Sequence, residues 1–364
     1  MRELKKIMIL ALIAAFMVSM LFIGTSCKKE AAVAEEAAEE AAPAEEAEEE
    51  APVAEGQRRV VFVTHDLNPF FVPAVVGLYD FAELAGWDAD FIGPAIHDTE
   101  STIETQYSVI ASKPDAVAFT AVDSEAFIEP ITEAQEAGIF VVLFNTRAPG
   151  VKERTGVAYV GQEFISAGNI AGYEICKYVE KHTGRKDGKI VMSNFAPGHF
   201  ALEARNLGGS QGVERYNEEF GTSYVTEDLA TSSDAVEAIA KFEAKWLAES
   251  DQIVGWLSSE FTHGFIGNWA KKEGLVGRFA VGGYDLVDNV LLGIQDGSVD
   301  FTIGQNPYAQ GFLTAALIYQ GLEAGYPASD IDTGAEIVDS TNIEDIIARE
   351  AKWVEKGKEL GIIK

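Results

Sequence analysis

The hydrophobic pattern of the chain changes near residue 58. From there to residue 364, short continuous apolar runs alternate with longer segments of helical character. Continuous apolar runs favour parallel strands that are buried on both faces. We expect strands at residues 60–63, 87–92, 116–120, 139–144, 157–160, 189–193, 223–229, 252–258, 278–282 and 300–304. We expect helices at residues 71–85, 101–112, 124–137, 164–182, 200–219, 234–248, 262–273, 286–292 and 307–324, then a short strand near 335–338 and a helix near 343–360.

This alternation predicts an α/β fold with parallel, doubly wound sheets. About ten strands are more than one sheet comfortably holds. We therefore expect two similar Rossmann-like lobes. In the helix at 164–182, the small residues Ala167, Ala171 and Gly172 predict a face that packs closely on a neighbour.

The segment after the first strand carries the first candidate ligand residues. The residue before proline is disfavoured in the α region, so the step Asn68-Pro69 interrupts the chain before a helix restarts at Phe71. Asn68, Phe70 and Phe71 are then expected at the carboxyl end of a strand, where open α/β sheets bind ligands. One amide and two rings suit a neutral polar ligand with apolar faces, such as a sugar. The alternative is that both phenylalanines are ordinary core residues.

The first 27 residues are typical of a bacterial export signal. Three basic residues precede an apolar run of 15 residues at 9–23, which is short for a membrane span. Small residues then lead directly to Cys27, as in lipoprotein signals, so we expect Cys27 to become the lipidated first residue. The alternative is an ordinary signal peptide with an incidental cysteine.

Residues 28–57 differ sharply in composition from residues 58–364. They contain eleven Glu, two Lys and no aromatic residue, a composition that cannot bury enough apolar surface to fold alone. We expect this segment to be a disordered acidic tether between the anchor and the folded part, extended by self-repulsion.

Charge and cysteine content narrow the classes of function. The chain carries a formal charge of −30, of which residues 58–364 contribute −23. Such acidity argues against nucleic-acid binding and against a polyanionic ligand. Apart from Cys27 only Cys176 is present, so we expect no disulfide within the folded part and a small buried apolar residue at Cys176.

Seven short motifs follow expected strands or open the next helix. They are Asn68-Pro69-Phe70-Phe71, Ala121-Val122-Asp123-Ser124, Phe144-Asn145-Thr146-Arg147, Tyr159-Val160-Gly161-Gln162, Ala196-Pro197-Gly198 with Arg205 before Gly208, Gly282-Gly283-Tyr284-Asp285, and Thr302-Ile303-Gly304-Gln305-Asn306-Pro307. Together they resemble the type I periplasmic sugar-binding proteins, the group of ribose- and galactose-binding proteins that feed ABC transporters. The resemblance covers residues 58 to about 345.

The resemblance implies two lobes that are joined by three crossing segments and close on the ligand by hinge rotation. The crossings are expected near 159–162, 304–307 and 338–341. Lobe one is then residues 58–161 plus 306–338, and lobe two is residues 162–305 plus 339–364.

The resemblance also implies roles for individual residues. Phe70 and Phe71 match rings that sandwich a pyranose, whose C–H faces pack on aromatic faces. Asn68 matches an amide that bonds sugar hydroxyls.

Charged and amide groups complete the expected site. Arg205 matches an arginine whose planar fork donates to adjacent hydroxyls. Asp285 matches a carboxylate that accepts from two hydroxyls, and Gln305 matches an amide on the hinge. The alternative for Arg205 and Asp285 is a salt bridge at the surface or the hinge.

Other positions depart from the family pattern. Asn145 and Thr146, followed by Arg147, replace the usual aspartate and arginine after strand four, and Ser259-Glu260 replaces the usual Asn-Asp pair. We keep Asp123, Asn145, Arg147 and Glu260 as further candidate ligand contacts. The aromatic residue expected near position 235 is missing, and Phe200 and Phe261 are the candidates to fill its space. These departures predict a hydroxyl pattern that differs from that of ribose or galactose. We therefore expect a different pentose or hexose, a deoxy sugar, an inositol or a sugar-like signalling molecule.

The sequence contains no signature of an enzyme. Its five histidines are scattered, without HExxH or zinc-finger spacing, and no glycine-rich phosphate loop opens the first strand. We therefore expect neither catalysis, a metal nor a cofactor. A transcription regulator of this fold would need an N-terminal DNA-binding segment, where this chain has its signal and tether.

We thus expect a monomeric, lipid-anchored receptor, exposed to the periplasm or the cell exterior. It would capture a small neutral sugar or polyol and deliver it to the membrane subunits of an ABC permease. The alternative is a ligand sensor coupled to a membrane chemoreceptor or histidine kinase.

Overall fold

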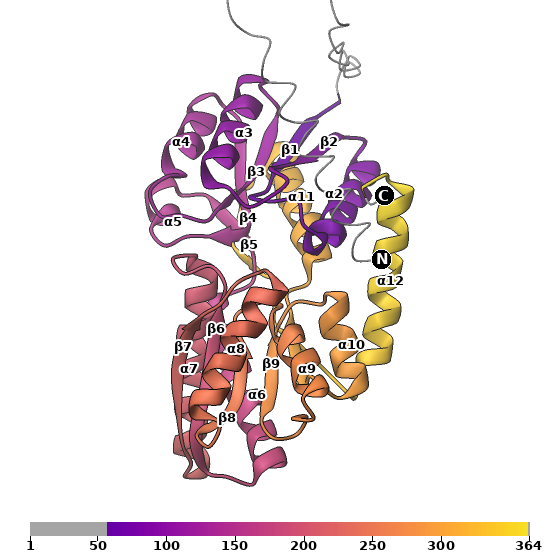
Figure 1. Ribbon diagram of the computed structural model, residues 1–364. Coiled ribbons are helices and arrows are strands. Elements are labelled where there is room, and N and C mark those ends of the chain that lie inside the picture. Colours follow the sequence, from indigo (N-terminus) through magenta and orange to yellow (C-terminus); the bar gives the residue numbers. More distant parts are fainter. Residues whose placement is uncertain (1–56, 363–364) are drawn as a thin grey trace, which may run out of the picture. The chain divides into compact units, whose positions relative to one another are not determined.

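The computed structural model describes residues 57–362 of the chain. The predicted signal, Cys27 and the tether as far as residue 56 lie outside the described residues. All described residues belong to one compact unit, which contains two sheets (Figure 1). In this part of the chain, no helix has the length and apolarity needed to cross a membrane.

The first sheet has six strands, and every strand pair in it is parallel. Its order is β11-β5-β4-β3-β1-β2. The strands are β1 (Arg59–Val63), β2 (Asp88–Ile92), β3 (Ala116–Ala121), β4 (Phe140–Arg147), β5 (Ala158–Gly161) and β11 (Ile331–Asp332). Its helices are η1 (Pro69–Phe71), α2 (Val72–Ala85), α3 (Thr99–Ala111), α4 (Ile128–Glu136), α5 (Val151–Thr155) and α11 (Pro307–Ala324).

Helices cover both faces of this sheet, which explains the continuous apolar strands. In β1, Val61 and Val63 pack in a core with residues of α3 and α4. Val60 and Phe62 point the other way, into a core with residues of α2 and α11. Successive side chains of a strand alternate between faces, so a strand buried on both faces needs an apolar residue at every position.

The second sheet also has six strands, in the order β12-β10-β9-β8-β6-β7, and only β12 is antiparallel to its neighbour. The strands are β6 (Asp187–Asn194), β7 (Ser223–Ala230), β8 (Ile253–Ser258), β9 (Ala280–Tyr284), β10 (Phe301–Gly304) and β12 (Glu336–Asp339). Its helices are α6 (Phe164–Thr183), α7 (Phe200–Phe220), α8 (Ala235–Glu249), α9 (His263–Lys272), α10 (Asp288–Asp296) and α12 (Ile343–Glu359). Helices α6 and α7 cover one face, whereas α8, α9 and α10 cover the other.

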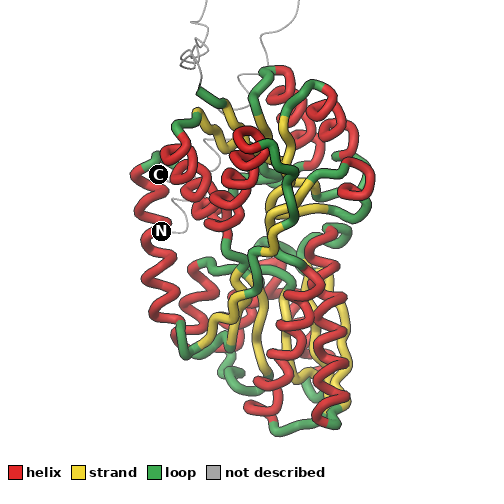
Figure 2. The backbone as a smooth tube through the Cα atoms, turned by 180° about the vertical axis from the view of Figure 1, so that it is seen from behind, coloured by secondary structure: helices red, strands yellow, loops and turns green. Residues whose placement is uncertain are grey.

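Three segments connect the sheets, as Figure 2 shows from behind. The chain changes sheet between β5 and α6, between β10 and α11, and between β11 and β12. The first two crossings lie where the sequence predicts them. The prediction of the third crossing near 338–341 is wrong. This crossing falls between residues 332 and 336, because β12 already pairs with β10 of the second sheet. Lobe one therefore consists of residues 59–161 with 307–332, and lobe two of residues 164–304 with β12.

Helix α12 contacts both lobes. Near its start, Ile343 and Ile346 belong to a core of lobe two. Near its end, Trp353 stacks on Tyr308 of α11 with ring centroids 4.5 Å apart, and Lys356 pairs with Asp80 of α2. The assignment of residues 339–364 to lobe two alone is therefore incomplete.

Close helix packing is confirmed where the small residues of α6 predict it. Ala167 and Ala171 are buried, and a Cβ atom at Gly172 would lie 1.9 Å from the carbonyl oxygen of Gly209 in α7. Cys176, on the same helix, is free and buried, and its thiol donates to the Gly172 carbonyl.

Candidate ligand-binding site

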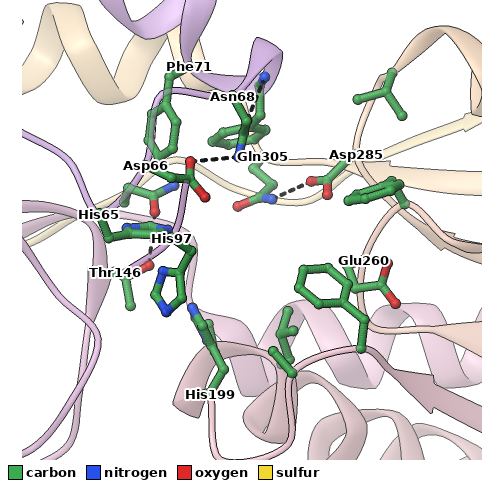
Figure 3. A pocket seen from close by; sticks show the side chains of 18 of the residues that line it. His65, Asp66, Asn68, Phe71, His97, Thr146, His199, Glu260, Asp285 and Gln305 are labelled. Carbon is green, nitrogen blue, oxygen red and sulfur yellow. Dashed lines mark hydrogen bonds between the residues drawn. The ribbon is translucent and has the colours of Figure 1, made fainter. Parts of the chain in front are cut away.

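A cavity of about 360 Å³ is lined by residues of both lobes (Figure 3). Its walls combine aromatic rings with amide, carboxylate, imidazole and guanidinium groups. The lining residues are His65, Asp66, Asn68, Pro69, Phe70, Phe71, His97, Asn145, Thr146, Phe164, Phe195, Ala196, His199, Ala201, Leu202, Arg205, Glu260, Phe261, Phe265, Asp285, Val287, Asn289 and Gln305.

Most of the predicted site residues meet at this cavity. The structure brings together Asn68, Phe70, Phe71, Asn145, Arg205, Glu260, Asp285 and Gln305. The carboxyl ends of β1, β4, β8 and β9 converge here, as expected for parallel sheets.

The loop after β1 positions the first group. The side chain of Asn68 accepts a hydrogen bond from the Phe70 backbone N–H at 2.8 Å and donates to Asp66 at 2.7 Å. Asn68 thereby caps η1, and this short turn presents both phenylalanines to the cavity. Phe71 is also buried in the lobe-one core. It is therefore both a core residue and a residue that lines the cavity.

Asn145 at the end of β4 has an uncommon backbone conformation. Its φ is +60°, a left-handed value that asparagine tolerates better than most residues. Its side chain donates to Gln310 at 3.0 Å and accepts from Thr146 at 2.8 Å. The amide is thus held rigidly, and rigid polar groups are typical of binding sites.

Arg205 of α7 is buried and fixed on three sides. Its guanidinium donates to the Ser259 carbonyl at 3.0 Å and to Gln162 at 3.1 Å, and it lies 4.4 Å from the ring centroid of Tyr284. Its Nε–H, although buried, donates to none of the described residues. A fixed cation with a spare donor is suited to hydrogen bonds with a ligand.

Asp285 and Gln305 form a direct pair beside the hinge. The Gln305 amide donates to the Asp285 carboxylate at 2.6 Å. Asp285 has φ +77°, and burial raises the pKa of its carboxyl while the charge of Arg205 opposes that rise. Arg205 and Asp285 are both buried, which excludes a salt bridge at the surface but not the alternative of a salt bridge at the hinge.

Glu260 is a buried acid of the cavity with a raised pKa. It is buried after β8 and accepts hydrogen bonds from the Thr262 backbone N–H and hydroxyl at 2.7 and 2.8 Å. Burial raises the pKa of Glu260 to about 8. The side chain is therefore protonated and neutral at pH 7, when it can donate a hydrogen bond as well as accept one.

This pKa predicts how stability depends on pH. An unfolded Glu titrates near 4.5, whereas folded Glu260 keeps its proton up to a pH of about 8, so the folded state binds more protons between these values. The contribution of Glu260 to the free energy of unfolding should then fall as pH rises toward 8, by up to about 1.4 kcal/mol per pH unit. Three buried histidines, His65, His199 and His263, have lowered pKa values, so the loss of protons from their unfolded forms raises stability with pH around 6.5 and masks Glu260 there. Above pH 7.5 unfolded histidine is largely neutral, which leaves the fall due to Glu260 measurable from 7.5 to 8.5.

Urea unfolding at a series of pH values checks this prediction. The decline from pH 7.5 to 8.5 should be much smaller in Glu260→Gln and unchanged in Glu83→Gln, whose side chain is exposed on α2. An equal decline in wild type and Glu260→Gln would show that another group is responsible.

Two predicted contacts lie elsewhere, so the expectation that they line the cavity is wrong. Asp123 is exposed, and its carboxylate accepts from the backbone N–H groups of Glu125 and Ala126, which uses it as a turn residue. Arg147 forms an ion pair with Asp330 at 2.7 Å and lies over the ring of Tyr159 at 4.8 Å. Neither residue lines the cavity.

Several lining residues were missed or left open by the sequence. Phe261 lines the cavity together with Phe195 and Phe265, whereas Phe200 packs in the lobe-one core cluster. His65, His97 and His199 also gather here. They are far apart in the sequence, and no local motif joins them.

Comparison with known proteins decides the family. Residues 59–325 match the model of the periplasmic binding protein domain. The chain belongs to the periplasmic binding protein family. This confirms the predicted resemblance and fold class, and it implies an exported protein that works outside the cytoplasm. Because the family and its relatives are solute-binding proteins, the prediction that this periplasmic binding protein is not an enzyme is confirmed as well.

Relatives of this periplasmic binding protein include sugar binders. The xylose/arabinose-binding protein XylF of Sulfolobus acidocaldarius is 27% identical over 304 residues, which cover 79% of this chain and 72% of the relative. A glucose-galactose binding protein, GanP of Geobacillus stearothermophilus, has a TM-score of 0.69 and 18% identity over 79% of this chain and 98% of its own. A solute-binding protein of Burkholderia graminis, solved with D-arabinose, has a TM-score of 0.70 and 20% identity over 79% and 96%.

Proposed function

We propose that this protein captures a small neutral sugar or polyol between its lobes and delivers it to an ABC permease. The observation that carries this proposal is the composition of the cavity. Rings of Phe70, Phe71 and Phe261 lie on the same cavity as the planar polar groups of Arg205 and Asp285. A sugar presents apolar C–H faces and a rim of hydroxyls, each of which donates and accepts, so it needs both kinds of wall.

The charge of the cavity favours a neutral ligand. Arg205 and Asp285 offset one another, and Glu260 is neutral at pH 7 because its pKa is about 8. A charged ligand group beside these three residues would find no spare opposite charge, which is costly. The other carboxylate of the lining, Asp66, lies beside His65 and His97. The cavity volume of about 360 Å³ is at the small end for ligand sites.

The split of the site between lobes supports capture by closure. Asn68 and Asn145 belong to lobe one, whereas Arg205 and Asp285 belong to lobe two. A ligand that touches both sides prefers the closed state, and this preference shifts the lobes toward it. The sugars named for the relatives, pentoses and hexoses, are the ligands to test first.

The proposed membrane anchor and delivery to a permease are supported by the sequence alone. Cys27 would carry the lipid anchor, and the acidic tether would allow the domain to reach a permease. The sensor alternative uses the same cavity, so it does not change the expected ligand.

A thermal-shift panel of neutral sugars and polyols tests the ligand class. Xylose, both enantiomers of arabinose, glucose, galactose, tagatose and inositol are compared with amino acids. A ligand at 100 times its Kd stabilises the folded state by about 2.7 kcal/mol, which raises Tm by roughly 5 °C. At least one sugar or polyol should do so. Stabilisation by an amino acid alone would refute the proposal.

A further inference from the structure

The cavity wall contains a group of side chains that a neutral sugar does not require. His65, Asp66 and His97 each offer one ligand atom, and these three atoms lie within 4.8 Å of one another. His65 follows β1, and His97 lies in the loop between β2 and α3. Thus two neighbouring strands of lobe one place two imidazoles and a carboxylate at one spot (Figure 3).

A third imidazole approaches from lobe two. His199 precedes α7, and its ring centroid lies 6.0 Å from that of His65 and 5.8 Å from that of His97. The Nδ1 atoms of His65 and His199 are buried and have no hydrogen-bond partner among the described residues. Buried polar atoms normally have a partner, so these two nitrogens point to a ligand that binds between the rings.

We propose that His65, Asp66 and His97 form a binding site for a divalent transition-metal ion such as Zn²⁺. His199 completes the site as a fourth ligand from the opposite lobe. Imidazole nitrogen and carboxylate oxygen bind Zn²⁺ at about 2.0–2.2 Å, usually with four ligands. Tetrahedral geometry then places neighbouring ligand atoms about 3.3 Å apart. The present separation closes by small movements of the exposed His97.

The surroundings fit a metal site in two further respects. Asn68 donates to the Asp66 carboxylate at 2.7 Å, and such a partner orients a carboxylate that binds a metal. His65 is held edge-on against Phe71, with ring centroids 5.6 Å apart, so one ligand is fixed in place. Because the metal ligands belong to both lobes, a bound ion would favour the closed arrangement of the two lobes around the sugar.

Titration of the full-length protein, without a histidine tag, with ZnCl₂ and CoCl₂ tests this site. Calorimetry should show one ion per chain, and Co²⁺ should give visible absorption typical of tetrahedral nitrogen and oxygen ligands. The variants His97→Ala and Asp66→Asn should each weaken Zn²⁺ binding by at least ~10- to 100-fold. The loss of a residue that only hydrogen-bonds to a metal ligand already lowers metal affinity by that factor. His199→Ala should weaken binding as well, because it removes the ligand that lobe two supplies.

His182→Gln is the matched control. This histidine pairs with Asp300 in lobe two, away from the cavity, so its loss should leave Zn²⁺ affinity unchanged. The site is refuted if no ion binds at micromolar concentration, or if His97→Ala and Asp66→Asn bind Zn²⁺ like wild type. The role of His199 is refuted if His199→Ala binds like wild type. Sugar binding is measured separately on the same samples, so a failure of the metal site is distinguishable from a failure of the proposed function.

Discussion

Asp285→Ala is expected to lower the affinity for the best-binding sugar by at least ~100-fold. The carboxylate of Asp285 receives one hydrogen bond from Gln305, and its remaining lone pairs are available to sugar hydroxyls in the cavity. A hydrogen bond to a charged group contributes about 1.5–3 kcal/mol, so losing two of them costs 100-fold or more. Arg205→Ala should have a similar effect, because it removes the fixed guanidinium from the same cavity.

Calorimetric titration of wild type and variants measures this loss. Because alanine is strained at the φ of +77° that Asp285 adopts, Asp285→Asn is included as a variant that tolerates this conformation. Circular dichroism should show that the variants remain folded. The matched control is Asp123→Ala, whose carboxylate lies outside the cavity, and it should bind sugar like wild type. Sugar affinity that survives in both Asp285→Asn and Arg205→Ala would remove these residues from the site.

The second large effect is on stability. Gly172→Ala is expected to destabilise the protein by about 3 kcal/mol or more, the upper range for overpacking. The added Cβ would lie 1.9 Å from the carbonyl oxygen of Gly209, and a backbone atom cannot rotate away as a side chain can. Helices α6 and α7 would have to separate, which would open one face of the second sheet.

Urea unfolding measures this change in free energy. Ser166→Ala on the same helix is the control, because Ser166 is exposed and surface substitutions usually change stability by less than about 0.5 kcal/mol. An equal midpoint for Gly172→Ala and wild type would show that α6 and α7 are not in close contact at this position.

The fold was predictable because its signals are local. Each strand of a doubly covered sheet carries its own apolar run, as β1 does, and each helix between strands is long enough to be recognised. The third crossing was not predictable in the same way. Strands β11 and β12 have two and four residues, and their sheet is decided by pairing with β5 and β10 rather than by their own pattern.

The site was predictable where family motifs mark strand ends. Asp285 and Gln305 come from different segments, yet both follow strands of the same sheet and meet. Asp123 also follows a strand, but its carboxylate accepts hydrogen bonds from the backbone of its own turn. Asp side chains commonly form such local hydrogen bonds. The histidines were missed as a group because His65, His97 and His199 come together only when both lobes are in place.

A crystal structure of the protein with the sugar that raises its Tm most would show directly whether both lobes hold the ligand. We expect the sugar in the cavity between the lobes, its ring packed on Phe71 or Phe261 and its hydroxyls bonded to Arg205 and Asp285. A sugar bound outside this cavity, or one held by a single lobe, would show that the two lobes do not capture the ligand between them.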